Sequence, residues 1–179
     1  MGYLTVFSTA SLVMHGGCYL EYDGGMPSEW LSWYLDAATA LHTGPITWGG
    51  LGGKGFINTN PYTDTILNYV RFSIDDSTLS SGRNNTITTY LPLPYQLGVN
   101  DCVSFARDLA SACGLNVPTP AFLASNLVLF LNGANSPTNF GLGLDHPLPW
   151  ELGFGDDGAS ASSSTPDDGS TDGSDPAPT

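Results

Sequence analysis

Residues 95–118, YQLGVNDCVSFARDLASACGLNVP, constrain the fold more than any other stretch, because they mark both ends of a helix. Asn100 or Asp101 can cap the free amides at its start. Apolar side chains then recur on one face, and Gly114 followed by Leu115 is typical of a left-handed stop with an apolar contact. The stretch therefore predicts an amphipathic helix with well-defined ends.

Short runs rich in aromatic and branched residues, bounded by glycine, predict strands elsewhere in the chain. They cover residues 3–10 and 18–22, a piece around 46–48 and another near 67–74. The glycine-rich stretch GLGGKG at 50–55 matches no phosphate-binding spacing, so we expect a flexible turn there.

Two further helices are expected, because apolar residues recur at helical spacing. The first covers residues 27–41, and the second covers 119–133 with Thr119 as its cap. Residues 75–94 are polar and then rich in proline, so we expect a connection without regular structure.

Strands followed by helices without regular alternation predict an α+β fold. A chain of 179 residues with 41% hydrophobic content can bury a core in one domain, which we assign to residues 1–154. Residues 155–179 contain no aromatic side chain and no aliphatic one larger than alanine. This segment is therefore expected to be a disordered acidic tail rich in Gly, Ser, Asp and Pro.

The charge of the chain argues against two classes of partner. Four Lys and Arg against 17 Asp and Glu give a net charge of −13, which offers no cationic surface to nucleic acid or anionic lipid. No apolar run reaches the roughly 18 residues that a membrane span needs. The first residues lack the basic start of a secretory signal, so we expect a cytoplasmic protein or one exported by a signal-independent route.

Neither a metal nor a cofactor is predicted. Three cysteines are too few for a disulfide framework in a chain of this size, and no pair of them has zinc-ligand spacing. The role of Cys18, which stands three residues after His15, stays open between packing, disulfide formation and oxidation.

Cys102 allows two interpretations. At the first turn of a helix, the macrodipole and the free amides favour the thiolate, which is the form that attacks a carbonyl carbon. However, Cys102, Phe105, Ala106 and Leu109 share helical spacing, and cysteine is among the most buried residue types. The position alone therefore fits either a nucleophile or a structural cysteine.

A family resemblance adds to this pattern. From Tyr95 to Pro118 the chain reads Y-x-x-G-x-x-D-C-x-x-F-x-x-x-L-x-x-x-x-G-L-x-V-P. This pattern resembles the catalytic-cysteine helix of the NlpC-type papain-like superfamily, in which an Asp-Cys or Asn-Cys pair opens a helix that ends at a glycine.

The order of the segments resembles the circularly permuted, lecithin-retinol-acyltransferase-like branch of this superfamily. The stretch HGGCYLEY, which begins at His15, is similar to the histidine-led strand of that branch. The stretch ITWGG at 46–50 is similar to the Thr-aromatic-Gly strand that follows it. The separation of His15 and Cys102 along the chain is also of the right order, although Gly16 and Gly17 follow the histidine here.

The resemblance implies a papain-like fold in which a small antiparallel sheet packs against helices, with the cysteine at the start of a helix. It also implies a thiol-dependent hydrolase or acyltransferase acting on an amide or ester bond, as in bacterial relatives. Its substrates would be peptides, peptidoglycan fragments or acyl esters.

In this scheme Cys102 is the nucleophile, His15 is the base, and the imidazole needs a third polar group to orient it. His42 is our candidate for the third group, although it can equally stabilise the last turn of the helix expected before it. His146 is expected to be a loop residue. We further expect His15 to hold Cys102 as a thiolate that reacts well below the ordinary thiol pKa of about 8.5.

The alternative is a non-catalytic binding or structural module with the same fold. A Cys102 thiol enclosed by apolar packing and far from every histidine would favour this alternative.

Overall fold

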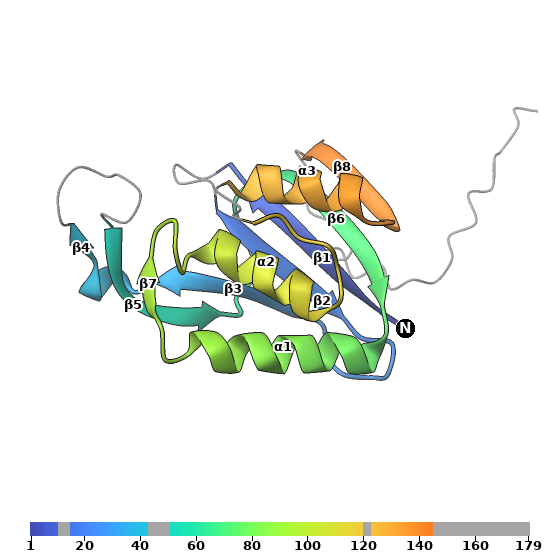
Figure 1. Ribbon diagram of the computed structural model, residues 1–179, viewed down its shortest axis with the longest axis horizontal. Helices are drawn as coiled ribbons and strands as arrows, with labels where there is room; N and C mark the ends of the chain where they lie inside the picture. The colour runs from blue at the N-terminus through green and yellow to red at the C-terminus, as the bar shows by residue number, and fades with distance from the viewer. Residues whose placement is uncertain (11–14, 43–50, 120–122, 145–179) are drawn as a thin grey trace, which may run out of the picture. The chain divides into compact units, whose positions relative to one another are not determined.

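A sheet of antiparallel strands, in the order β4-β5-β3-β2-β1-β6-β8, organises the computed structural model (Figure 1). The structure describes residues 1–10, 15–42, 51–119 and 123–144. The strands are β1 (Gly2–Thr9), β2 (Gly16–Glu21), β3 (Glu29–Leu35), β4 (Leu41–His42), β5 (Leu51–Asn58), β6 (Ile66–Ile74), β7 (Pro94–Gln96) and β8 (Asn139–Leu144). The short strand β7 pairs with β5.

Helices in the described part of the chain cover one face of this sheet (Figure 1). They are α1 (Asp76–Tyr90), α2 (Cys102–Ala112) and α3 (Ala124–Ala134), together with the short 3-10 turn η1 (Ala37–Thr39). Helix α2 packs over β2 and β3, α3 over β1 and β6, and α1 lies beside α2. These elements confirm the predicted α+β class.

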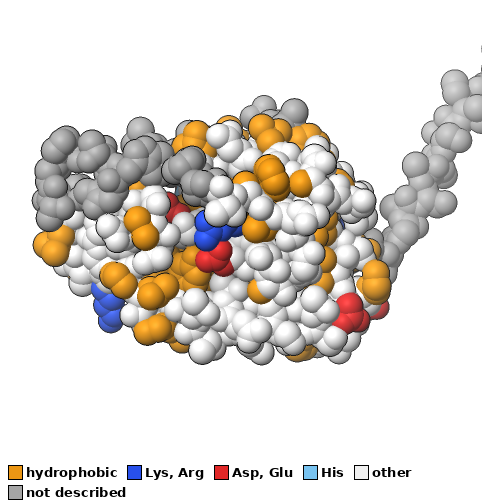
Figure 2. Space-filling model, in the orientation of Figure 1, with side chains coloured by type: hydrophobic (Ala, Val, Ile, Leu, Met, Phe, Trp, Pro, Cys, Tyr) orange, Lys and Arg blue, Asp and Glu red, His pale blue; other side chains and the backbone are white. Residues whose placement is uncertain are grey.

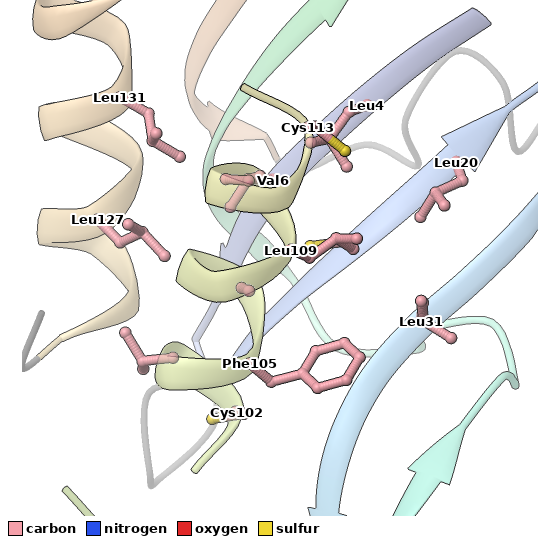
Figure 3. Close-up of a cluster of buried hydrophobic side chains, with 14 of the residues drawn as sticks. Leu4, Val6, Leu20, Leu31, Cys102, Phe105, Leu109, Cys113, Leu127 and Leu131 are labelled. Carbon is pink, nitrogen blue, oxygen red and sulfur yellow. The ribbon is translucent and has the colours of Figure 1, made fainter. Parts of the chain in front are cut away.

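The register of the strands decides which side chains meet the helices. Val6 of β1 stands opposite Cys18 of β2, and Leu4 stands opposite Leu20. All four side chains are buried in one hydrophobic core with Phe105 and its neighbours on α2 (Figure 3). Side chains alternate between the two faces of a strand, so the remaining positions of β1 to β3 face away from the helices.

That second face carries a cluster of aromatic rings. Phe7 packs edge-on against Trp30 of β3 at 5.4 Å and against Tyr62, which lies between β5 and β6, at 4.8 Å. Tyr19 of β2 meets the same Trp30 ring at 4.7 Å. Charged side chains are sparse on the side of the molecule shown in Figure 2.

Several sequence predictions are confirmed. The strands expected at 3–10, 18–22 and 67–74 correspond to β1, β2 and β6, and the helix expected in 95–118 is α2. Gly114 follows α2 with φ +84°, and the amide of Leu115 donates to the carbonyl of Ala110 at 3.1 Å. The helix therefore ends in the expected left-handed stop.

The helix expected at 27–41 is wrong, because residues Glu29–Leu35 form strand β3. Leu31 and Trp33 face the helices, whereas Trp30 packs in the aromatic cluster on the other face. A strand buried on both faces carries an uninterrupted apolar run, and such a run can also be fitted to helical spacing.

Two segments expected to be irregular are regular. Residues 75–94 contain helix α1, which buries only Leu79, Gly82, Thr86 and Tyr90 and therefore shows little apolar periodicity. The expected turn at 50–55 lies largely within β5, where glycine is needed for close packing.

The third helix begins later than predicted, at Ala124, and its cap residue is Leu123 rather than Thr119. Strand β8 was not predicted. The strand expected around 46–48 and the tail expected at 155–179 lie outside the described residues. Among the helices in the described ranges, none has the length and apolarity needed to cross a bilayer.

Gly55 provides a test of the packing between β5 and β3. A β-carbon at this position would lie 1.9 Å from Cζ2 of Trp33, which is itself fully buried. We expect Gly55→Ala to lower the free energy of unfolding by at least about 2 kcal/mol in urea titrations.

Gly133 is the matched control, because a β-carbon there would meet no atom within 4 Å and the residue lies in α3. We expect Gly133→Ala to be neutral or to stabilise the protein by up to about 1 kcal/mol. Equal stabilities for the two variants would contradict the described contact between β5 and Trp33.

Candidate functional site

Cys102 is the first residue of α2, and a well-formed turn holds it there. The Asp101 carboxylate accepts hydrogen bonds from the amide of Ser104 at 2.9 Å and from the amide of Gly98 at 2.7 Å. Gly98 has φ +78°, which suits glycine in this turn. Asp101 thus caps the helix and ties it to the loop that follows β7, as the sequence predicted.

The sulfur of Cys102 is buried but has polar partners. Only 3% of the residue is exposed. The backbone amide of Gly16, the hydroxyl of Tyr95 and the amide of Val103 lie near enough to the sulfur to lower its pKa. Cys102 nevertheless belongs to the hydrophobic core, and Figure 3 shows it at the start of α2, at the edge of the buried apolar side chains.

Burial dominates the acidity of this thiol. It raises the pKa of Cys102 to about 12, and the nearby Asp101 charge acts in the same direction. The nearby Gly16 amide and Tyr95 hydroxyl lower the pKa, but they do not overcome burial. The expectation of a resting thiolate is therefore wrong, and Cys102 is protonated at neutral pH.

His15 lies directly before β2 and next to Gly16. Its Nε2 atom is 3.5 Å from Oγ of Ser32 on β3. Its ring packs on Tyr34 at 4.2 Å and stacks on Tyr62 at 5.5 Å. Burial lowers the pKa of His15 to about 4, so the imidazole is neutral at pH 7 and is a weaker base than an ordinary histidine.

The groups around His15 form one polar network. Tyr62 donates a hydrogen bond to Ser32 Oγ at 2.8 Å, and Tyr34 lies near enough to Tyr62 and Asn58 for both to affect its pKa. Burial raises the pKa of both tyrosines, and ionisation of Cys102 would raise both further. The network therefore lies within electrostatic range of the sulfur.

The structure brings Cys102 and His15 to the same end of β2. The sulfur lies near the amide of Gly16, which is the residue immediately after His15. The imidazole contacts Ser32, Tyr34 and Tyr62, and none of the described contacts joins it directly to the sulfur. The His15 ring and the Cys102 sulfur are thus related through Gly16, which follows the histidine in the chain and lies near the sulfur.

His42 is not adjacent to this site in the sheet. Its backbone belongs to β4 and pairs with Leu51 of β5, so β5 and β3 lie between it and β2. Its side chain and the whole of His146 lie outside the described part of the structure. The helix expected before His42 is absent, and the turn η1 precedes it instead.

Sequence reasoning assigned no role to Ser32, Tyr62 or Tyr95. Tyr95 belongs to the motif that identified Cys102, and its spacing from the cysteine was the available signal. Ser32 and Tyr62 reach His15 only through strand pairing and loop packing, so no local pattern marks them.

The other cysteines are separate from this site. Cys18 faces the core, and Cys113 closes the far end of α2; all three cysteines are free thiols. Burial raises the pKa of Cys18 and also that of Cys113, the latter to about 11. Within the described ranges, no group of three His, Cys, Asp or Glu residues is arranged to hold a metal ion.

Comparisons of the chain with protein-family models, with curated proteins and with solved structures find no match.

The lowered pKa of His15 predicts how stability depends on pH. Between about pH 6.5 and pH 4 the unfolded chain binds a proton at His15 that the folded chain does not bind. The free energy of unfolding should therefore fall by about 3 kcal/mol through His15 as the pH is lowered across this range.

Urea titrations of the wild type and His15→Gln at several pH values measure this contribution. The difference between the two proteins isolates His15 from the carboxylates, which both proteins share. If the free energies of unfolding of the two proteins changed equally between pH 6.5 and 4, the imidazole of His15 would have its ordinary pKa in the folded state.

Proposed function

We propose that this protein is a cysteine-dependent hydrolase or acyltransferase that acts on amide or ester bonds, with Cys102 as nucleophile and His15 as base. The observation that carries the proposal is the proximity of the Gly16 amide to the Cys102 sulfur, since it brings the residue next to His15 to the start of α2. The α+β fold supports the finer assignment, a permuted NlpC-type papain-like architecture.

The reaction begins from a neutral thiol and a neutral imidazole. His15 accepts the Cys102 proton while the sulfur attacks the carbonyl carbon, and the resulting imidazolium protonates the leaving amine or alcohol. The thioester on Cys102 is then attacked by water or by a second acceptor, whose proton passes to His15 and from there to the departing sulfur as the C–S bond breaks. The thiol is restored and no oxidant or reductant is consumed.

Ser32 replaces His42 as the group that orients the imidazole. Tyr62 donates to Ser32 Oγ, which leaves that oxygen able to accept a hydrogen bond from His15 Nε2. We assign the ring proton to Nε2 accordingly, so that Nδ1 carries the free lone pair that a base needs.

Tyr95 supplies a donor at the reacting centre. The Tyr95 hydroxyl lies near the Cys102 sulfur and lowers its pKa, so it is the group that we assign to stabilise negative charge beside the sulfur.

The proposed substrates are peptides, peptidoglycan fragments and acyl esters. The acidic chain, with a net charge of −13, disfavours strongly anionic ones.

The second candidate function is a non-catalytic binding or structural module. The burial of Cys102 favours it, because a residue that is 3% exposed with its pKa raised to about 12 is a poor nucleophile at rest. The two functions differ in one measurable respect, which is whether an acyl group is transferred to Cys102.

Acyl transfer is tested with a chromogenic acyl ester and a thiol-directed acylating probe. We expect wild-type protein to form a thioester at Cys102, identified by peptide mass spectrometry. His15→Ala should lower turnover at least about 100-fold, because it removes the base. Cys102→Ala should abolish turnover, whereas Cys113→Ser at the other end of α2 should retain it.

Acylation that persists in Cys102→Ala, or that is absent from the wild type with every ester tested, would favour the non-catalytic module. Iodoacetamide labelling provides a second readout. Native Cys102 should label more slowly than the unfolded chain at pH 8, because burial holds the thiol protonated.

Ser32 is tested separately through the tautomer of His15. We expect Ser32→Ala to lower kcat about tenfold with little change in KM, because the imidazole loses its orienting acceptor. Nitrogen-15 NMR of the ring should show protonated Nε2 in the wild type and a mixture of tautomers in Ser32→Ala. Ser32→Thr keeps the hydroxyl and should restore both properties; an unchanged ring spectrum in Ser32→Ala would contradict the assignment.

A further inference from the structure

A cavity of about 320 Å³ lies between helix α1 and the connection from β2 to β3. One wall is a stripe of α1 formed by Ser80, Arg83 and Asn84, which share a helix face at i, i+3 and i+4. The other wall comes from the connection and its flanking strand residues, namely Tyr22, Met26, Pro27 and Glu29. The cavity volume is within the range of small-molecule sites.

This cavity is distinct from the Cys102 site. Tyr22 follows the last residue of β2, whereas Gly16 at the first residue contacts the Cys102 sulfur. Six residues of extended strand separate the two positions by about 20 Å. A ligand in the cavity would therefore not touch the proposed nucleophile.

An ion pair is held in place at the wall of the cavity. Arg83 Nε and Nη2 donate to the two oxygens of Glu29 at 2.5 and 2.8 Å, and Tyr22 donates to Glu29 at 3.3 Å. Arg83 Nη1 donates to Asn84 Oδ1 at 2.9 Å. The side chains of Arg83 and Glu29 are only 32% and 20% exposed, so the pair is ordered before any ligand arrives.

The charges of this pair determine the class of ligand. Arg83 and Glu29 neutralise one another, so the charges of the side chains that line the cavity sum to zero. Guanidinium and Asn84 N–H groups, Glu29 oxygens and the Ser80 hydroxyl nevertheless offer closely spaced donors and acceptors. The favoured ligand is therefore uncharged and carries several neighbouring hydroxyl groups.

The remaining lining residues provide an apolar surface. Met26 is 44% exposed and lies beside Pro27 and the ring of Tyr22. A sugar ring combines a hydroxyl edge with an apolar C–H face, which matches both surfaces of the cavity. An amide offers a single donor and acceptor pair, which would leave most of the polar groups unmatched.

We propose that the cavity between α1 and the β2–β3 connection binds an uncharged saccharide, with Asn84, Ser80 and the Arg83–Glu29 pair on its hydroxyl edge and Met26 on its apolar face.

Ligand-observed NMR with the full chain tests this proposal. The sugars compared have the same type of ring but differ in charge. The probes are glucose and N-acetylglucosamine, which are neutral, glucosamine, which is a cation, and glucuronate, which is an anion. We expect saturation transfer to the two neutral sugars and severalfold weaker binding of the two charged ones. Backbone amide shifts should change in residues 22–29 and 80–84.

Two substitutions on neighbouring asparagines provide matched variants. Asn84→Ala should weaken binding of the neutral sugars about fivefold, because it removes a hydrogen-bonding partner from the cavity. Asn85→Ala removes the same group from the next position of α1, which does not line the cavity, and should leave binding unchanged.

Removing the charge of Glu29 should change which sugar the cavity binds best. Glu29→Gln leaves Arg83 unpaired, and this variant should favour glucuronate over glucose. Thermal unfolding of each variant establishes that it is folded.

The proposal is overturned if no neutral sugar binds, if the charged sugars bind equally well, or if Asn84→Ala binds like the wild type. Binding of a neutral dipeptide amide in place of the sugars would also overturn it and would indicate a peptide site. None of these outcomes depends on the activity of Cys102.

Discussion

Burial of α2 against β1, β2 and β3 is the interaction on which the rest of this structure depends. It places Phe105 and Leu109 in one hydrophobic core with Cys18 and Leu31 of the sheet. It also brings the first turn of the helix to the beginning of β2, where the Gly16 amide reaches the sulfur. The same burial excludes water from the thiol and keeps it protonated.

The chemistry of the site depends on two opposing effects on Cys102, namely its position at the start of a helix and its removal from water. A helix start favours a thiolate, but desolvation at Cys102 exceeds that effect, and desolvation likewise keeps His15 neutral. Both members of the pair therefore begin without charge. In the reaction we propose, proton transfer between them would create two charges in a poorly hydrated environment, and the tyrosines and backbone amides around the sulfur would be the main source of stabilisation.

Local patterns predicted the parts of the fold whose ends are marked in the sequence. Helix α2 was found because Asp101 caps it and Gly114 ends it. Strand β3 was misassigned because it is apolar on both faces, and α1 was missed because a polar helix beside α2 has almost no apolar period.

For the candidate site, the sequence identified Cys102 and His15 but not their partners. Ser32 and Tyr62 meet the imidazole through the pairing of β2 with β3 and through the packing of the loop after β5. Such contacts depend on register and have no local signature.

The connection between Gly16 and Cys102 has a consequence for biosynthesis. The histidine strand leaves the ribosome long before the cysteine helix, and the amide of Gly16 has no sulfur to meet until α2 is complete and docked. The growing chain thus carries both halves of the site apart from one another for most of its synthesis. The acyl transfer that we propose needs both halves, so it can begin only after α2 has packed against the sheet.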